Sequence, residues 1–262
     1  MTSDTAAHIE TPVDTGTALW LYAIRDGTAP APEVTGVHKE PVACVYAGGL
    51  AAVVGSVPLR EFNSATLELN LNDFDWLADA ARAHHAVIGA AAQDRPVIPI
   101  RLAVLCRDEG SVRQLLIERH KEFRTALALV EGRAEWGVRA YLRSPGDNND
   151  RPRPTSGADY LRQRRDALQR NRTDLADAEL AASTMFRTLC RHAVAARCRP
   201  STDSTLTGRR AHLVLNAAYL VDMSKVADFL SAAKEFDDHE LLVIERSGPW
   251  PPYTFVGAAG EL

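Results

Sequence analysis

The chain has 262 residues, with 30 basic and 34 acidic side chains and a formal net charge of −4 at pH 7. This length is enough for one large domain or two small ones, each with a real core. The slight negative charge argues against a nucleic-acid-binding surface, and no apolar run approaches the roughly 20 residues that a membrane span needs. The four cysteines form no Cys-x-x-Cys pair and have no histidine at zinc spacing, so we expect reduced thiols and no metal site.

The N-terminal segment is polar and mildly acidic over residues 1–17. It has neither the basic start nor the apolar stretch of a secretion signal. We interpret it as a disordered leader and expect a cytoplasmic protein.

Residues 18–143 alternate between strand-like and helix-like patterns, with a Gly48-Gly49 turn signal and a helix cap at Asn72 or Asp73. Strands and two helices on one sheet predict a modified ferredoxin-like N-terminal domain. The predicted elements are strands over 19–24, 42–46 and 50–57, a helix over 73–92, a strand over 96–105, a helix over 111–131 and a strand over 136–142.

A polar segment rich in proline and glycine follows over 144–157, and we interpret it as a linker loop. Residues 158–262 then predict a C-terminal α+β domain with a long helix and a tail of prolines and aromatics. The predicted fold class is therefore α+β, with two small domains. The elements expected in the second domain are a helix over 158–197, a strand over 212–221, a helix over 224–236 and a strand over 240–245.

The long helix has a repeating apolar pattern and mixed charges. Leu161, Leu168 and Leu175 recur every seven residues, which is typical of a coiled coil, although the repeat is short. We favour an amphipathic helix, or a helix pair bent near residues 171–174, that covers a sheet. Its many arginines and carboxylates form either a solvated face or an electrostatic contact with an assembling partner.

His84 lies on the apolar stripe of the helix predicted over 73–92. A ligand or an acid/base group is one interpretation of such a histidine. We favour a hydrogen-bonded core or edge histidine, because no carboxylate or second ligand accompanies it at a useful spacing. His85 points about 100° away around the helix and should be more exposed.

The last segment, over 246–255, contains three prolines that favour a stiff, polyproline-like ribbon and end the strand before it. Leaving its three aromatic side chains in water would forfeit several kcal/mol at ~25 cal/mol per Å². We therefore expect them to be largely buried against the protein itself, the alternative being a docking strip for a partner. The candidate structural or interaction residues are Trp250, Pro251, Pro252, Tyr253, Phe255, His84 and Trp136; no catalytic, metal-binding or cofactor-binding residue is predicted.

An ordered set of short segments covers most of the chain, and it ends in GPWPPY at 248–253. In order and spacing the set resembles the gas vesicle protein F/L family over about residues 18–255. One departure is Leu102-Ala103, where the family usually has Phe-Gly. The other matching segments are 19–24, 76–77 with His84 and Val87, 96–101, 135–139, 159–161 and 216–221.

The resemblance implies an assembly or minor structural protein of gas vesicles, which are hollow shells built from a small, very hydrophobic subunit. Such a protein would bind the shell subunit and other accessory proteins, need no cofactor, associate with the shell and have no enzymatic activity. The main alternative is a small-molecule-binding or enzymatic α/β protein with a cleft between its domains. A third is a coiled-coil oligomerisation scaffold built on Leu161, Leu168 and Leu175.

Overall fold

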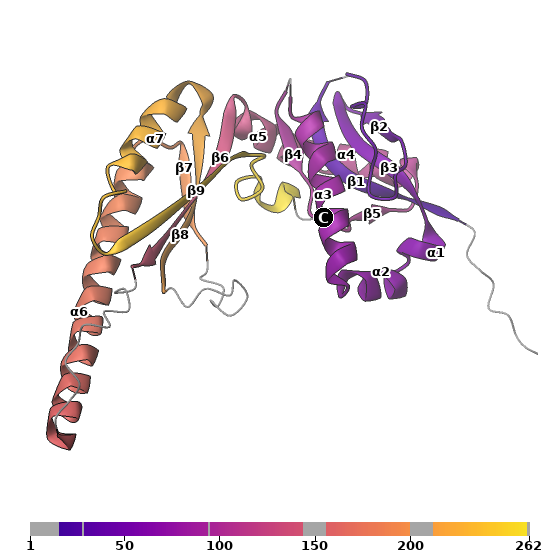
Figure 1. The fold of residues 1–262 in the computed structure, drawn as a ribbon. Helices are drawn as coiled ribbons and strands as arrows, with labels where there is room; N and C mark the ends of the chain where they lie inside the picture. The colour runs from indigo at the N-terminus through magenta and orange to yellow at the C-terminus, as the bar shows by residue number, and fades with distance from the viewer. Residues whose placement is uncertain (1–15, 28, 94, 144–155, 200–211, 261–262) are drawn as a thin grey trace, which may run out of the picture. The chain divides into compact units, whose positions relative to one another are not determined.

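The computed structural model describes residues 16–27, 29–93, 95–143, 156–199 and 212–260. Most of the predicted leader and of the predicted linker lies outside the described residues. The chain forms two compact units, one made of Met1–Leu129 with Val256–Leu262 and the other of Val130–Phe255. Figure 1 shows the elements of both units, which are described one at a time.

The first unit contains an antiparallel sheet in the order β2-β3-β1-β4, with β5 also paired to β1. Its strands are β1 (Thr17–Asp26), β2 (Val42–Ala47), β3 (Leu50–Pro58), β4 (Val97–Pro99) and β5 (Leu105–Cys106). Its helices are α1 (Leu59–Phe62), α2 (Ser64–Leu71), α3 (Phe74–Ala91), α4 (Glu109–Glu118) and α5 (His120–Val130), and a short turn, η2 (Gly257–Gly260), packs against β4.

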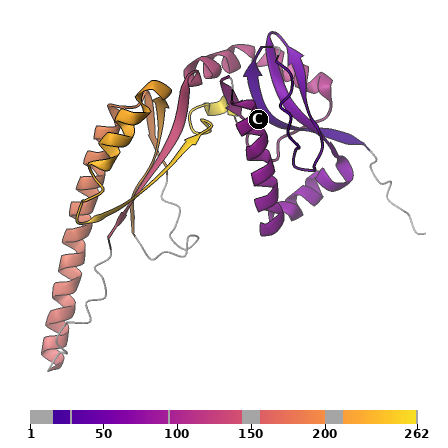
Figure 2. The ribbon, with the colours of Figure 1, turned by 45° about the horizontal axis from the view of Figure 1, so that its top comes forward.

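The second unit contains a four-stranded antiparallel sheet in the order β7-β8-β6-β9. With its two helices it follows the β-α-β-β-α-β order of the ferredoxin-like motif, and Figure 2 shows α6 and α7 along one face of the sheet. Its elements are β6 (Arg133–Leu142), α6 (Gly157–Cys190), β7 (Ala195–Cys198), β8 (Leu213–Asp222), η1 (Met223–Lys225), α7 (Val226–Lys234) and β9 (Leu242–Trp250).

The predicted α+β class is confirmed, and the complete ferredoxin-like order lies in the second unit, not in the first. The first sheet has the same strand order, but a loop instead of a helix connects β1 to β2. The predicted end of the first domain at residue 143 placed β6 before the linker, in that domain. In the structure β6 pairs with β8 and β9, because its partners are set by long-range pairing and not by distance along the chain.

Two predicted boundaries were also wrong. The long helix ends at Cys190 and the chain turns into β7, which local periodicity did not reveal. Strand β9 continues through Pro249 to Trp250 instead of ending before the prolines. A proline is tolerated there because β9 is an end strand of the sheet and Pro249 lies at an irregularity in its pairing with β6, between the Ser247 and Trp250 pairs.

Strand β1 is the central strand of the first unit, and consecutive side chains on both of its faces are buried. Trp20, Leu21 and Tyr22 are each completely inaccessible to solvent. Helix α3 packs against β1, and α4 lies against β2 and β3. The predicted cap of α3 is confirmed, since the Asp73 carboxylate accepts hydrogen bonds from two N–H groups of the first turn.

A buried polar network ties the loop between β1 and β2 to the sheet. The Tyr22 hydroxyl donates to Glu40 Oε1 at 2.5 Å and accepts from the Val37 N–H at 2.9 Å. Glycine is required at two neighbouring positions, because a Cβ at Gly36 or Gly55 would lie within about 2 Å of the Glu40 carboxylate. Burial and the bond to Glu40 raise the pKa of Tyr22 above its usual value.

The core of the second unit lies between its sheet and the C-terminal half of α6. Small side chains on α6, at Ala178 and Ala182, let the helix approach the strands closely, while Met185 and Leu189 fill the remaining space. Aromatic contacts with Tyr219, on β8, extend this core. Within the described ranges, none of the helices is both long enough and apolar enough to cross a bilayer.

Replacing Tyr22 with phenylalanine should destabilise the first unit by about 1–3 kcal/mol, because the Val37 N–H and the Glu40 carboxylate each lose a buried partner. Urea unfolding followed by circular dichroism measures the effect. Tyr160→Phe is the matched control, since Tyr160 is exposed on α6. Equal stability of the two variants would contradict a structural role for this network.

Candidate protein interaction site

The clearest candidate site is the edge strand β9 and the segment that follows it. Trp250 is 45% exposed and Tyr253 is 36% exposed, whereas Phe255 is only 5% exposed. The expectation that all three aromatics would be largely buried was therefore wrong for two of them. We call Trp250, Pro251 and Tyr253 the aromatic surface; the neighbouring Pro252 is buried.

The aromatic surface is held in place by a buried carboxylate on β6. Glu135 is 3% exposed, and it accepts hydrogen bonds from the Thr254 N–H at 2.8 Å and from the Thr254 hydroxyl at 2.7 Å. Arg199, just after β7, donates to the same carboxylate and to the Thr254 hydroxyl. Phe255 then packs against Ala218 and Leu220 of β8.

These anchoring residues were not identified from the sequence. The only local signal was Glu135, the single carboxylate of a strand whose other charged residues are Arg133 and Arg139. Its partner Thr254 lies 119 residues away, so no local pattern joins the two. Partial burial and the charge of Glu135 raise the pKa of Tyr253 to about 12, so its hydroxyl stays protonated at neutral pH.

Trp136 supports the strand from which the aromatic surface extends. It is 9% exposed, its ring lies near Phe229, and its indole N–H has no hydrogen-bond partner among the described residues. The β9 backbone passes very close to it, since a Cβ at Gly248 would lie 3.0 Å from the Trp136 ring. Gly248 also has a φ of +134°, so both this backbone conformation and the contact with Trp136 exclude a side chain there.

His84 is a core residue, as the favoured interpretation predicted, and it belongs to the first unit. It is 3% exposed; its Nδ1 accepts from the Trp20 indole N–H at 2.9 Å, so its Nε2 donates to the Ile100 carbonyl at 2.9 Å. Burial lowers its pKa to about 4, and the imidazole is neutral at pH 7. Because both ring nitrogens are hydrogen-bonded, His84 has no nitrogen available for a substrate or a metal. His85 is more exposed than His84, as expected.

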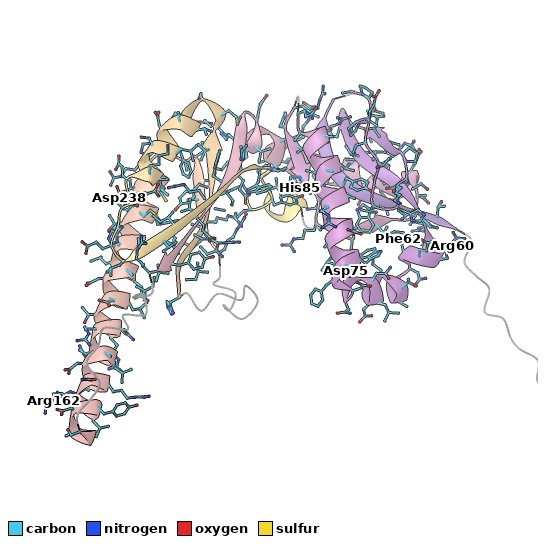
Figure 3. All side chains as sticks on the ribbon, in the orientation of Figure 1. Arg60, Phe62, Asp75, His85, Arg162 and Asp238 are labelled. Atoms are coloured by element: carbon cyan, nitrogen blue, oxygen red, sulfur yellow. The ribbon has the colours of Figure 1, made fainter. Side chains whose placement is uncertain are left out.

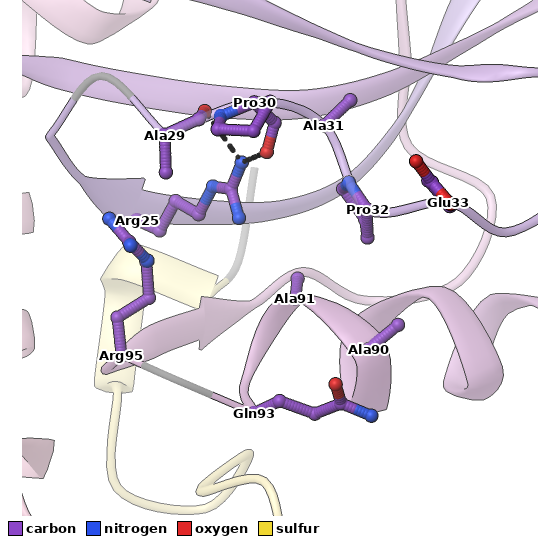
Figure 4. A pocket seen from close by; sticks show the side chains of 10 residues that line it. All are labelled: Arg25, Ala29, Pro30, Ala31, Pro32, Glu33, Ala90, Ala91, Gln93 and Arg95. Carbon is purple, nitrogen blue, oxygen red and sulfur yellow. Dashed lines mark hydrogen bonds between the residues drawn. The ribbon is translucent and has the colours of Figure 1, made fainter.

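A cavity of about 340 Å³ lies in the first unit between the loop after β1 and the end of α3 (Figure 4). The buried Arg25 guanidinium points at this loop and donates to the carbonyls of Ala29, at 2.9 Å, and Pro30. Arg95 and Gln93 line the other side. Arg25 fixes the loop through these two carbonyls, while its buried Nε has no hydrogen-bond partner among the described residues.

The described residues also contain no group of three or more metal-ligating side chains. All four cysteines are free, and three of them are partly buried. Burial raises the pKa of the Cys106 and Cys190 thiols, which keeps them in the less reactive protonated form at neutral pH.

The neutral, buried state of His84 should make folding pH-dependent. In the unfolded chain His84 binds a proton near pH 6.5, whereas in the folded chain it does so only near pH 4. The free energy of unfolding therefore falls as the pH drops through this window. From pH 7.5 to pH 5 the loss from this group should be about 2 kcal/mol. Urea unfolding at both pH values should show a smaller loss in His84→Gln; an identical loss would contradict the assignment.

Removing the charge of Glu135 should loosen the C-terminal segment. Glu135→Gln leaves Arg199 without its carboxylate and weakens both bonds to Thr254, at a cost of about 1–3 kcal/mol. Urea unfolding measures the loss, and limited proteolysis should show faster cleavage near Thr254. Glu131→Gln, at an exposed position, is the control and should behave like the unsubstituted protein.

The fold matches two crystal structures of GvpF proteins. The gas vesicle protein GvpF of Anabaena sp. PCC7120 superimposes with a TM-score of 0.66 at 19% identity, over 92% of this chain and 96% of that one. GvpF of Microcystis aeruginosa gives a TM-score of 0.61 at 20% identity, over 91% and 98% of the two chains. At these identities the likeness concerns the fold alone.

Sequence comparison identifies relatives over almost the whole length. Gas vesicle protein L of Streptomyces sp. (strain CB03234) is 39% identical over 252 residues, covering 92% of this chain and 94% of the relative. Gas vesicle protein F1 of Halobacterium salinarum is 25% identical over 211 residues, covering 79% and 82%. The family model described as gas vesicle synthesis protein GvpL/GvpF matches residues 18–257. The chain therefore belongs to the GvpL/GvpF family of gas vesicle synthesis proteins, as its sequence motifs suggested.

Proposed function

We propose that this protein is a non-enzymatic accessory or minor structural protein of gas vesicles that binds the shell subunit during assembly. Family membership supports the accessory role, since the relatives named above are all gas vesicle proteins. The binding step is supported by one observation, the exposure of Trp250 and Tyr253 on an anchored segment. The protein would act at the growing shell and contact other accessory proteins there.

The chemistry of the aromatic surface suits an apolar partner. A shell subunit with apolar faces aggregates before it polymerises unless a partner covers those faces. Aromatic side chains supply large contact areas and are common at the centres of interfaces. Because Glu135 and the prolines already hold the segment, little conformational entropy is lost when a partner binds.

Edge pairing adds a second way to bind. Strand β9 is an end strand of its sheet, so its outer backbone groups face away from the ladder. Pro249 removes one donor from this edge, which limits indiscriminate pairing with other chains. A partner strand would therefore pair before Pro249 and place its apolar side chains next to Trp250.

Co-expression with the shell subunit from the same organism tests the proposal. The shell subunit should co-purify with this protein, and the double variant Trp250→Ala, Tyr253→Ala should retain at most about a tenth of it, as expected when central aromatic contacts are lost. Both side chains are partly exposed, so the variant should still fold, which circular dichroism checks.

Phe74→Ala is the matched control, because Phe74 is 84% exposed in the first unit and lies outside the aromatic surface. It should co-purify the shell subunit as well as the unsubstituted protein does. Failure of the unsubstituted protein to bind would overturn the proposal. Equal losses in the control and the double variant would show that the aromatic surface is not the binding site.

A further inference from the structure

Helix α6 is longer than the sheet that it covers. From residue 157 to residue 173 almost every side chain is exposed, and burial against the sheet begins only at Leu175 and Ala178. At 1.5 Å per residue this free portion is about 25 Å long. Figures 1 and 2 show α6 extending beyond the strands, and Figure 3 shows the Arg162 side chain near its free end.

The free portion carries an apolar stripe, Leu161 and Leu168, that nothing among the described residues covers, and the stripe ends at the partly buried Leu175. Leu161 is 67% exposed and Leu168 is 56% exposed, and Leu175 follows at the same spacing of seven. The next member of the series, Ala182, is buried against the sheet. The stripe therefore continues the packed face of the helix, with the rotation of about 20° per heptad that a straight α-helix produces.

Arginines lie between the leucines on the same side of the helix. Arg165 and Arg172 follow Leu161 and Leu168 by four residues, so each is a neighbour of the stripe. Residues 157–173 contain five arginines and two aspartates. Arg170 and Arg172 form no ion pair within the described part of the chain, and the closest pairs of Arg162 and Arg165 are long, at 3.6 and 3.7 Å.

This arrangement argues against a second copy of the chain as the occupant. In a parallel pair Arg165 and Arg172 would meet their own counterparts. In an antiparallel pair centred on Leu168, Arg172 would lie opposite the partner's Arg164. Like charges at such a seam are destabilising and commonly specify against self-pairing.

We propose that residues 161–175 of α6 bind an acidic amphipathic helix of another protein. Its apolar side chains would pack on Leu161, Leu168 and Leu175, and its carboxylates would lie opposite Arg165 and Arg172. Arg–carboxylate pairs at the edges of a short helical interface select the partner and its register. This second surface is separate from the aromatic surface, and the inference does not rest on shell binding.

The test uses full-length protein and a fluorescein-labelled synthetic helix with leucine at every seventh position and glutamate at the flanking positions. Fluorescence anisotropy at about 50 mM salt should show binding, which weakens strongly at about 500 mM because the ion pairs are screened. A matched peptide with lysine in place of glutamate should not bind. Leu168→Ser should weaken binding of the glutamate peptide at least tenfold, the order expected for losing a central apolar contact.

Two variants make the outcome decisive. Leu180→Ser is the control, because Leu180 is 64% exposed on the same helix but lies outside the stripe, and it should bind normally. The double variant Arg165→Glu, Arg172→Glu should reverse the preference and bind the lysine peptide. Absence of binding to the unsubstituted protein, equal binding of both peptides, or a self-dimer in analytical ultracentrifugation that Leu168→Ser dissolves would each overturn the proposal.

Discussion

The buried carboxylate of Glu135 is the interaction on which the C-terminal part of the molecule depends. It lies on the central strand β6 and gathers donors from Thr254 and Arg199, which come from distant parts of the second unit. A buried charge is stable only when it is paired or fully hydrogen-bonded. The segment after β9 satisfies this requirement, so its path is fixed and its aromatic side chains are presented on a rigid support.

The two units share a strand order but differ in how the first strand of the sheet is connected to the second. Both sheets have the same strand order, with the first strand of each in the interior and an antiparallel partner on either side. In the second unit α6 makes the first crossover. In the first unit a loop takes this path, and the Tyr22–Glu40 network provides the attachment that an amphipathic helix would otherwise provide by apolar packing.

The two proposed surfaces differ in the kind of partner they select. The aromatic surface is uncharged and suits an apolar partner. Its selectivity comes from the edge of β9, where Pro249 restricts which backbone groups a partner strand can pair with. The free part of α6 combines exposed leucines with an excess of arginines over aspartates, so it discriminates by charge. An accessory protein that bound a hydrophobic subunit through one surface and a charged helix through the other could bring different components together without competition between them.

The sequence alone determined the features that depend on neighbouring residues. The three strands of the first half, the Asp73 cap and the helical period that places His84 on an inner face all follow from local chemistry, and the structure contains them. The motifs of the last segment also pointed to the right family. The structure alone decided that β6 pairs with both β8 and β9, that Glu135 meets Thr254, and that Trp250 and Tyr253 stay exposed. The reason is physical: exposure and strand pairing depend on contacts between residues about a hundred positions apart, and no local period encodes such contacts.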